Sequence, residues 1–221
     1  MKILIVAAHS DDEALGCAGT MAKHIASGDE VHTLFMTDGV SSRNSADFQG
    51  GIERLSNAEL AAKIIGVSSM KNFDFPDNKM DQVALLEIVQ PIESLIDQLQ
   101  PDIIYTHHIG DLNIDHQITH KAVMTACRPQ PGFCVKSIYT FEVLSSTEWQ
   151  TNGYLQFMPN LLVDITQQIE IKRKVLEAYS QEMRSPPHSR SIDNVIRLNA
   201  VRGNSVGLDY AEAFISIREL R

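Results

Sequence analysis

A chain of 221 residues, of which 43% are hydrophobic and 21% charged, has the size and composition of one globular domain with a substantial core. The formal net charge of −9 argues against a nucleic-acid-binding surface, and no stretch approaches the roughly 20 apolar residues that a membrane span needs. The three cysteines include no C-x-x-C pair, which is typical of reduced thiols and predicts a cytoplasmic protein.

Predicted strands and helices alternate along the first half of the chain. Continuous apolar or β-rich runs predict strands at 3–8, 30–37, 70–75 and 101–108. Apolar residues at helical spacing predict helices at 13–27, 52–65, 83–99 and 116–126. Beyond residue 130 we expect strands at 137–143 and 161–166, a helix at 167–179 and an exposed loop at 182–191.

This alternation predicts an α/β fold, because strands joined by helical connections of a dozen or more residues run parallel. We expect residues 1–221 to form a single-domain, doubly wound, mostly parallel and Rossmann-like sheet with helices on both faces. Ligands of such sheets bind outside the carboxyl ends of the strands. Three polar stretches follow predicted strands and should meet at that edge, namely 9–13, 37–39 and 107–116.

Two of these stretches carry side chains that bind zinc in other proteins. The first predicted strand runs directly into His9-Ser10-Asp11-Asp12-Glu13, and burying neighbouring carboxylates without partners is costly. The second stretch, Thr106–His120, contains four of the eight histidines and two aspartates. A catalytic zinc ion takes three such ligands and keeps one position open for water. One ion bound between the stretches would offset the crowded acidic charge.

Each residue alone also has an ordinary structural interpretation. Asp11 or Asp12 would cap the helix that begins at Glu13, and Asp115 would cap the helix at 116–126. A single histidine after a strand is more often solvated, or satisfied within a core, than bound to a metal. The coincidence of all these residues at one predicted edge favours a site.

The acidic cluster belongs to a longer motif. The stretch His9-Ser10-Asp11-Asp12-Glu13, with Leu15-Gly16 and Gly19-Thr20, resembles the A-H-P-D-D-E-x-L-G-x-x-G-T signature of the LmbE-like, or PIG-L, de-N-acetylases. Similarity continues at Thr37-Asp38-Gly39, at Arg54, at Asp111-Leu112-Asn113-Ile114-Asp115-His116 and at Tyr210-Ala211-Glu212-Ala213-Phe214. The resemblance therefore extends over nearly the whole chain.

The resemblance implies roles for individual residues. The residues that match the zinc ligands of the family are His9, Asp12 and His116. It implies one ion per chain, and Fe²⁺ would also accept these donors. Asp11 matches the general base that takes a proton from the attacking water and returns it to the leaving amine. Asp115 would orient a ligating histidine. Arg54 matches a substrate-facing arginine, although an arginine on a helix surface looks the same in the sequence.

Two positions depart from the family pattern. Ser10 replaces a proline that stiffens the turn, and we expect little effect on chemistry. Asn113 stands where many members carry a histidine that stabilises the oxyanion of the tetrahedral intermediate. An amide can donate a hydrogen bond there but supplies no positive charge. His107 and His108 end the neighbouring strand, and we expect one of them, His108 by preference, to assist.

These features predict a zinc-dependent hydrolase that deacetylates an N-acetylated amino sugar, such as N-acetylglucosamine, or its conjugate. An amidohydrolase acting on another small N-acyl substrate would use the same chemistry. A non-catalytic nucleotide-binding module is disfavoured, because the turn after the first strand lacks a glycine-rich phosphate cradle. A structural or interaction protein would leave the clustered aspartates and histidines unexplained. We expect a small-molecule partner and no nucleic acid, loops 41–51 and 180–191 to select the substrate, and a homo-oligomer, as in many family members.

Overall fold

The computed structural model of the protein describes residues 1–37, 48–151, 153 and 155–220, with only the backbone for 48–52. Within these residues one seven-stranded sheet has the order β3-β2-β1-β4-β5-β7-β6. Its strands are β1 (Lys2–Ala7), β2 (Glu30–Thr37), β3 (Ser69–Phe75), β4 (Ile103–His107), β5 (Ser137–Phe141), β6 (Leu161–Asp164) and β7 (Ala211–Glu219). Strands β1 to β5 pair in parallel, and β7 runs antiparallel to both β5 and β6. The predicted, mostly parallel α/β fold is confirmed.

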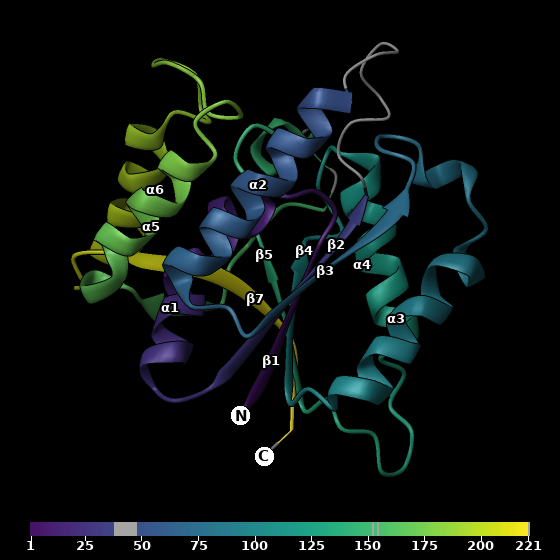
Figure 1. Cartoon of the computed structure of the whole chain (residues 1–221). Helices are drawn as coiled ribbons and strands as arrows, with labels where there is room; N and C mark the ends of the chain where they lie inside the picture. The colour runs from purple at the N-terminus through teal and green to yellow at the C-terminus, as the bar shows by residue number, and fades with distance from the viewer. Residues whose placement is uncertain (38–47, 152, 154, 221) are drawn as a thin grey trace.

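Helices cover both faces of the sheet, as Figure 1 shows. One face carries α1 (Asp12–Ala26), α2 (Phe48–Ile65), α5 (Ile169–Ala178) and α6 (Ile192–Asn204). The other carries α3 (Leu85–Leu99) and α4 (Ile114–Ala126). No helix among the described residues is long and apolar enough to cross a membrane.

The apolar run of β1 is buried because its side chains serve two cores. Ile3 and Ile5 point into the core beneath α1, α2 and α5. Leu4 and Val6 point into the core beneath α3 and α4. All four are at most 1% exposed. A strand covered on both faces needs apolar residues at every position, which explains the uninterrupted run in the sequence.

The order of the strands reverses beside β1, and this positions the site. From β1 the chain moves outward to β2 and β3, and it then returns to β4 on the other side of β1. The carboxyl ends of β1 and β4 therefore flank the crevice in which doubly wound sheets bind ligands. The two His/Asp stretches of the sequence follow these two strands.

The second half of the chain departs from the sequence-based expectation in four features. Neither α6 nor the antiparallel β7 was expected, and the strand expected at 137–143 ends at Phe141. The loop at 182–191 is not wholly exposed, because Glu182 and Ser191 are buried at its two ends. Asp38 and Gly39, which match the family motif, and most of the 41–51 loop lie outside the described residues.

Candidate active site

The turn between β1 and α1 places three of the predicted site residues. The backbone N–H of His9 donates to Oδ2 of Asp12 at 2.8 Å and thereby closes the turn. Asp11 occupies the N-cap position with a φ of 121°, a conformation that costs an L residue about 1–3 kcal/mol. His9, Asp11 and Asp12 are all buried. Backbone strain at this turn suggests that the placement of its side chains has a function.

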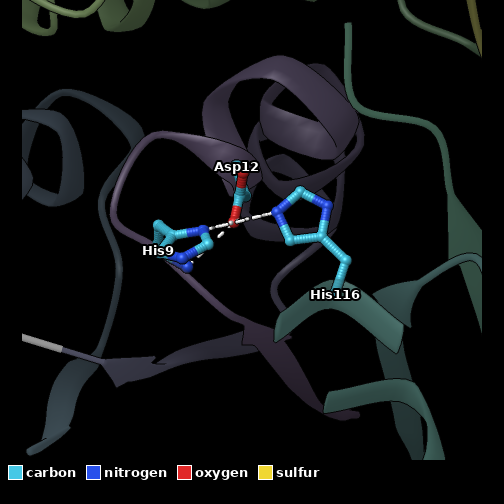
Figure 2. A group of neighbouring side chains, drawn as sticks. All are labelled: His9, Asp12 and His116. Atoms are coloured by element: carbon cyan, nitrogen blue, oxygen red, sulfur yellow. Dashed lines mark hydrogen bonds and ion pairs between the residues drawn. The ribbon is translucent and has the colours of Figure 1, made fainter. Parts of the chain in front are cut away.

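His116, in the first turn of α4, brings a second imidazole to Asp12. Nδ1 of His9 lies 3.3 Å from Oδ2 of Asp12 and 3.3 Å from Nε2 of His116. Nε2 of His116 lies 3.3 Å from the same Asp12 oxygen, and Figure 2 shows the two rings turned toward that carboxylate. Two imidazole nitrogens and one carboxylate oxygen match the donor set of a three-ligand zinc centre. The chemistry of these donors therefore fits the metal that the sequence predicts.

The charges of these groups depend strongly on one another. Burial acts to raise the pKa of Asp12, but the imidazoles of His116 and His107 hold it well below its usual range. Burial acts to lower the pKa of His116, but Asp12 and Asp111 raise it to about 9. Without an ion, the carboxylates are thus balanced by protonated imidazole. A metal must displace protons to bind here, so its affinity should fall at low pH.

Further carboxylates face the far ring nitrogens of His9 and His116, the two histidines of the candidate ligand group. Oδ2 of Asp115 lies 3.2 Å and Oδ1 of Asp77 lies 3.1 Å from Nε2 of His9. Oδ1 of Asp111 lies 3.1 Å from Nδ1 of His116. In each case the carboxylate faces the ring nitrogen that points away from Asp12, the arrangement that fixes ring orientation in metal sites.

His9, Asp77 and Asp115 could themselves be considered as a second ligand group. However, the carboxylate of Asp115 already accepts hydrogen bonds from the backbone N–H groups of Asn78 at 2.6 Å and Met80 at 3.1 Å. The group also shares His9 with the first set. We therefore interpret Asp77 and Asp115 as partners that orient His9.

Asp11 faces two arginines instead of the histidines. Its Oδ2 accepts a hydrogen bond from Nη1 of Arg190 at 2.9 Å, and its Oδ1 lies 3.9 Å from Nη2 of Arg54. Arg54 is also 3.5 Å from Oε1 of Glu182, through its Nε atom. Burial raises the pKa of Asp11, and the two arginines oppose that rise. The neighbouring carboxylates of the turn thus have different partners.

These groups line a cavity of about 400 Å³ at the carboxyl edge of the sheet. Its described lining combines the metal-ligand set with the Asp11–Arg54–Glu182–Arg190 group. Trp149, the one tryptophan of the chain, and Leu112 add apolar surface, and both are about half exposed. The site can therefore hold a small polar molecule that also has an apolar surface.

Of the three predicted oxyanion donors, the structure brings only Asn113 into the cavity lining. Its Oδ1 accepts the N–H of Asp115 at 2.8 Å, which caps α4, and its Nδ2 donates to Oδ1 of Asn78 at 3.3 Å. His108 instead pairs through Nε2 with the carbonyl of Leu155 at 3.0 Å. The expected preference for His108 therefore finds no support in its position.

His107 contacts the site through the ring of His116. Its ring stacks on His116 at a centroid distance of 3.9 Å, and its Nε2 accepts the N–H of Ala8 at 2.8 Å. Burial and the neighbouring His116 lower its pKa to about 4, so the ring is neutral. A neutral, fully buried ring does not supply the positive charge that the sequence suggested for this position.

The sequence and the fold are similar to those of known proteins. The family model described as PIG-L, GlcNAc-PI de-N-acetylase, matches residues 4–127, more than half of the chain. The chain belongs to the PIG-L family. The matched segment contains His9, Asp11, Asp12 and His116. It also contains the three carboxylates that face the far ring nitrogens of the two histidines, those of Asp77, Asp111 and Asp115.

The chain is also similar to two curated relatives and to a solved structure. An uncharacterized deacetylase, YaiS, of Escherichia coli K12 is 28% identical over 171 residues, which are 75% of this chain and 83% of YaiS. The diacetylchitobiose deacetylase of Thermococcus kodakarensis is 26% identical over 198 residues, 82% of this chain and 70% of that enzyme. The structure of GalB, a 4-carboxy-2-hydroxymuconate hydratase of Pseudomonas putida KT2440, superposes with a TM-score of 0.81 at 21% identity, covering 100% and 97% of the two chains. The last similarity concerns the fold alone.

Sequence reasoning missed several residues of the cavity. Asp77 follows β3 at the same edge as the other polar stretches, so its position after a strand was an available signal. Trp149 ends a three-residue 3₁₀ helix, and Glu182 and Arg190 come from an irregular loop. In neither place does a periodic pattern indicate which side chains turn inward. Asp111 was recognised within the motif but was assigned no role.

Proposed function

We propose that this protein is a zinc-dependent deacetylase of an N-acetylated amino sugar or of a conjugate of such a sugar. The observation that supports this proposal is the arrangement of His9, Asp12 and His116 around one point, with the carboxylate of Asp11 beside them in the same cavity. His9, Asp12 and His116 would hold the zinc ion. When bound, zinc polarises an amide carbonyl and lowers the pKa of water.

The remaining chemistry follows from the residues of the chain. Asp11 would accept the proton of the attacking water at a carboxylate oxygen and later transfer it to the nitrogen of the leaving amine. The Nδ2 amide of Asn113 would donate to the carbonyl oxygen as that oxygen gains negative charge. Arg54, buried beside Asp11, would position polar groups of the substrate.

The family description and the activity named for the Thermococcus relative favour N-acetyl sugars as substrates. An amidohydrolase acting on another small N-acyl compound is the second candidate, because the cavity contains no feature specific to a sugar among its described residues. A hydratase shares the fold, so the fold by itself does not decide the reaction.

A screen for released acetate tests the proposal. Purified protein, with and without a chelator and with zinc restored, would be incubated with N-acetylglucosamine, diacetylchitobiose, nucleotide-linked N-acetyl sugars and N-acetylated amino acids. We expect zinc-dependent release from a sugar. D11N should keep its zinc, while turnover falls roughly 10²–10⁴-fold because the proton acceptor is gone. Release from amino acids alone would favour the second candidate, and wild-type turnover in D11N would remove Asp11 from the reaction.

Trp149 offers a measurement that does not depend on turnover. It lines the cavity and is the one tryptophan of the chain, so its fluorescence should change when a ligand enters. Binding by zinc-loaded D11N can therefore be followed even where no acetate is released.

A further inference from the structure

The side chain of Asp11 is not held by the helix that follows it. An aspartate at an N-cap normally accepts N–H groups of the first helical turn, but Asp11 makes no such bond. Instead Oε2 of Glu13 accepts the backbone N–H of Asp11 at 3.0 Å, and Oε1 of Glu13 accepts the hydroxyl of Tyr179 at 2.7 Å. The backbone at Asp11 is strained, with φ of 121°, and its carboxylate is free to turn toward a partner elsewhere.

That partner is Arg190, which ends the loop before α6. Its Nη1 donates to Oδ2 of Asp11 at 2.9 Å. The guanidinium is itself fixed, because its Nε donates to Oγ of Ser145 at 2.9 Å, and Ser145 is a second non-glycine residue with positive φ, at 63°. Arg190 thus lies between two residues with strained backbones, and the contact with Asp11 connects segments 179 residues apart.

The loop that carries Arg190 is anchored at both ends. The backbone N–H of Arg184 donates to the carbonyl of Arg190 at 3.2 Å, and the N–H of Arg190 donates to Nδ1 of His188 at 3.0 Å. Directly after it, the side chain of Ser191 caps α6 by accepting the N–H of Asn194. The guanidinium is therefore presented to the cavity by a defined backbone, and 18% of the side chain is exposed.

We propose that Arg190 is a positioning residue for Asp11, an inference that rests on the proposed role of Asp11 as general base. Arg190 binds Oδ2 of Asp11 at 2.9 Å, whereas Oδ1 of Asp11 lies 3.9 Å from Arg54. Oδ1 is therefore the oxygen that would accept the proton. Because the guanidinium is itself held by Ser145, its hydrogen bond to Oδ2 restricts the rotation of the carboxylate. Misplacement of a reacting group by about 1 Å can cost roughly 10²-fold in rate.

The test compares R190A with R190K and with a matched control, R184A. Arg184 belongs to the same loop and is exposed, and its guanidinium donates to the carbonyls of Gln181 and Met183. R190A should lower kcat roughly 10²-fold with little change in KM or zinc content. R190K should be intermediate because an ammonium is a point charge, and R184A should match the wild type. Added guanidinium ion should restore part of the turnover of R190A and none of that of D11N.

A crystal structure of R190A provides a readout that does not depend on activity, and in it the carboxylate of Asp11 should leave its place in the cavity. An unmoved carboxylate, or a wild-type kcat, would overturn the role of Arg190. Absence of acetate release by the wild-type protein from every compound would instead contradict the proposed function, and the position of Asp11 in R190A would still decide whether Arg190 holds it.

Discussion

Replacing Asp111 by asparagine tests whether a carboxylate behind His116 supports metal binding. Oδ1 of Asp111 lies 3.1 Å from Nδ1 of His116, and its oxygens also accept the hydroxyls of Ser146 and Thr147 and the N–H of Asn113. An asparagine keeps the volume and one acceptor oxygen, so D111N mainly removes the negative charge. Changes at such outer partners cost roughly 10–100-fold in metal affinity. Because part of the hydrogen bonding survives, we expect the lower part of that range, about 1.4–2 kcal/mol.

The zinc affinity of D111N would be measured by competition with a chromophoric chelator. The matched control is D29N. Oδ2 of Asp29 lies 2.8 Å from Nδ1 of His24, so it forms a comparable aspartate–histidine pair, but it precedes β2 at the opposite edge of the sheet. D29N should bind zinc like the wild type. A D111N affinity within twofold of the wild type, in a protein that unfolds at the usual denaturant concentration, would refute the supporting role of Asp111.

Three further predictions follow from the same geometry. H116A should lose most of its zinc by elemental analysis after dialysis, and full retention would contradict its assignment as a ligand. N113A should lower kcat roughly 10²–10³-fold if its amide donates to the oxyanion, whereas unchanged turnover would show that the group is dispensable. K172M should lower the free energy of unfolding by about 3–5 kcal/mol, because it leaves Glu212 charged and buried without the ammonium 2.6 Å away; an unchanged denaturation midpoint would contradict this.

The sequence predicted the parts of the site that follow from regular structure. The run of apolar residues before His9 predicts a buried parallel strand, and the run that ends at His107 predicts a second one. The two strands pair in parallel. Because both strands end at the same edge, the meeting of His9 with His116 could be predicted before any coordinates. The family motif then assigned roles to these residues. The ring contact between them, with centroids 5.3 Å apart, agrees with that prediction.

The sequence could not predict contacts made by irregular segments. Arg190 reaches Asp11 from a loop rich in serine and proline, for which no periodicity indicates an inward side. His108 was preferred because the outermost residue of the predicted strand reaches furthest into the cleft, yet its ring pairs with the carbonyl of Leu155. β7 was missed although it carries the Glu212 of the family motif, whose carboxylate accepts the N–H groups of Gly19 and Thr20 in α1.

The structure also explains how two adjacent carboxylates are tolerated in a buried turn. Asp12 faces two imidazoles, with Nε2 of His116 and Nδ1 of His9 each 3.3 Å from its Oδ2, while Asp11 is held by Arg190. Asp11 has a positive φ, and its carboxylate points to the arginines and not to the imidazoles that Asp12 contacts. The strained turn thus gives two identical neighbouring side chains different partners, imidazoles for Asp12 and arginines for Asp11.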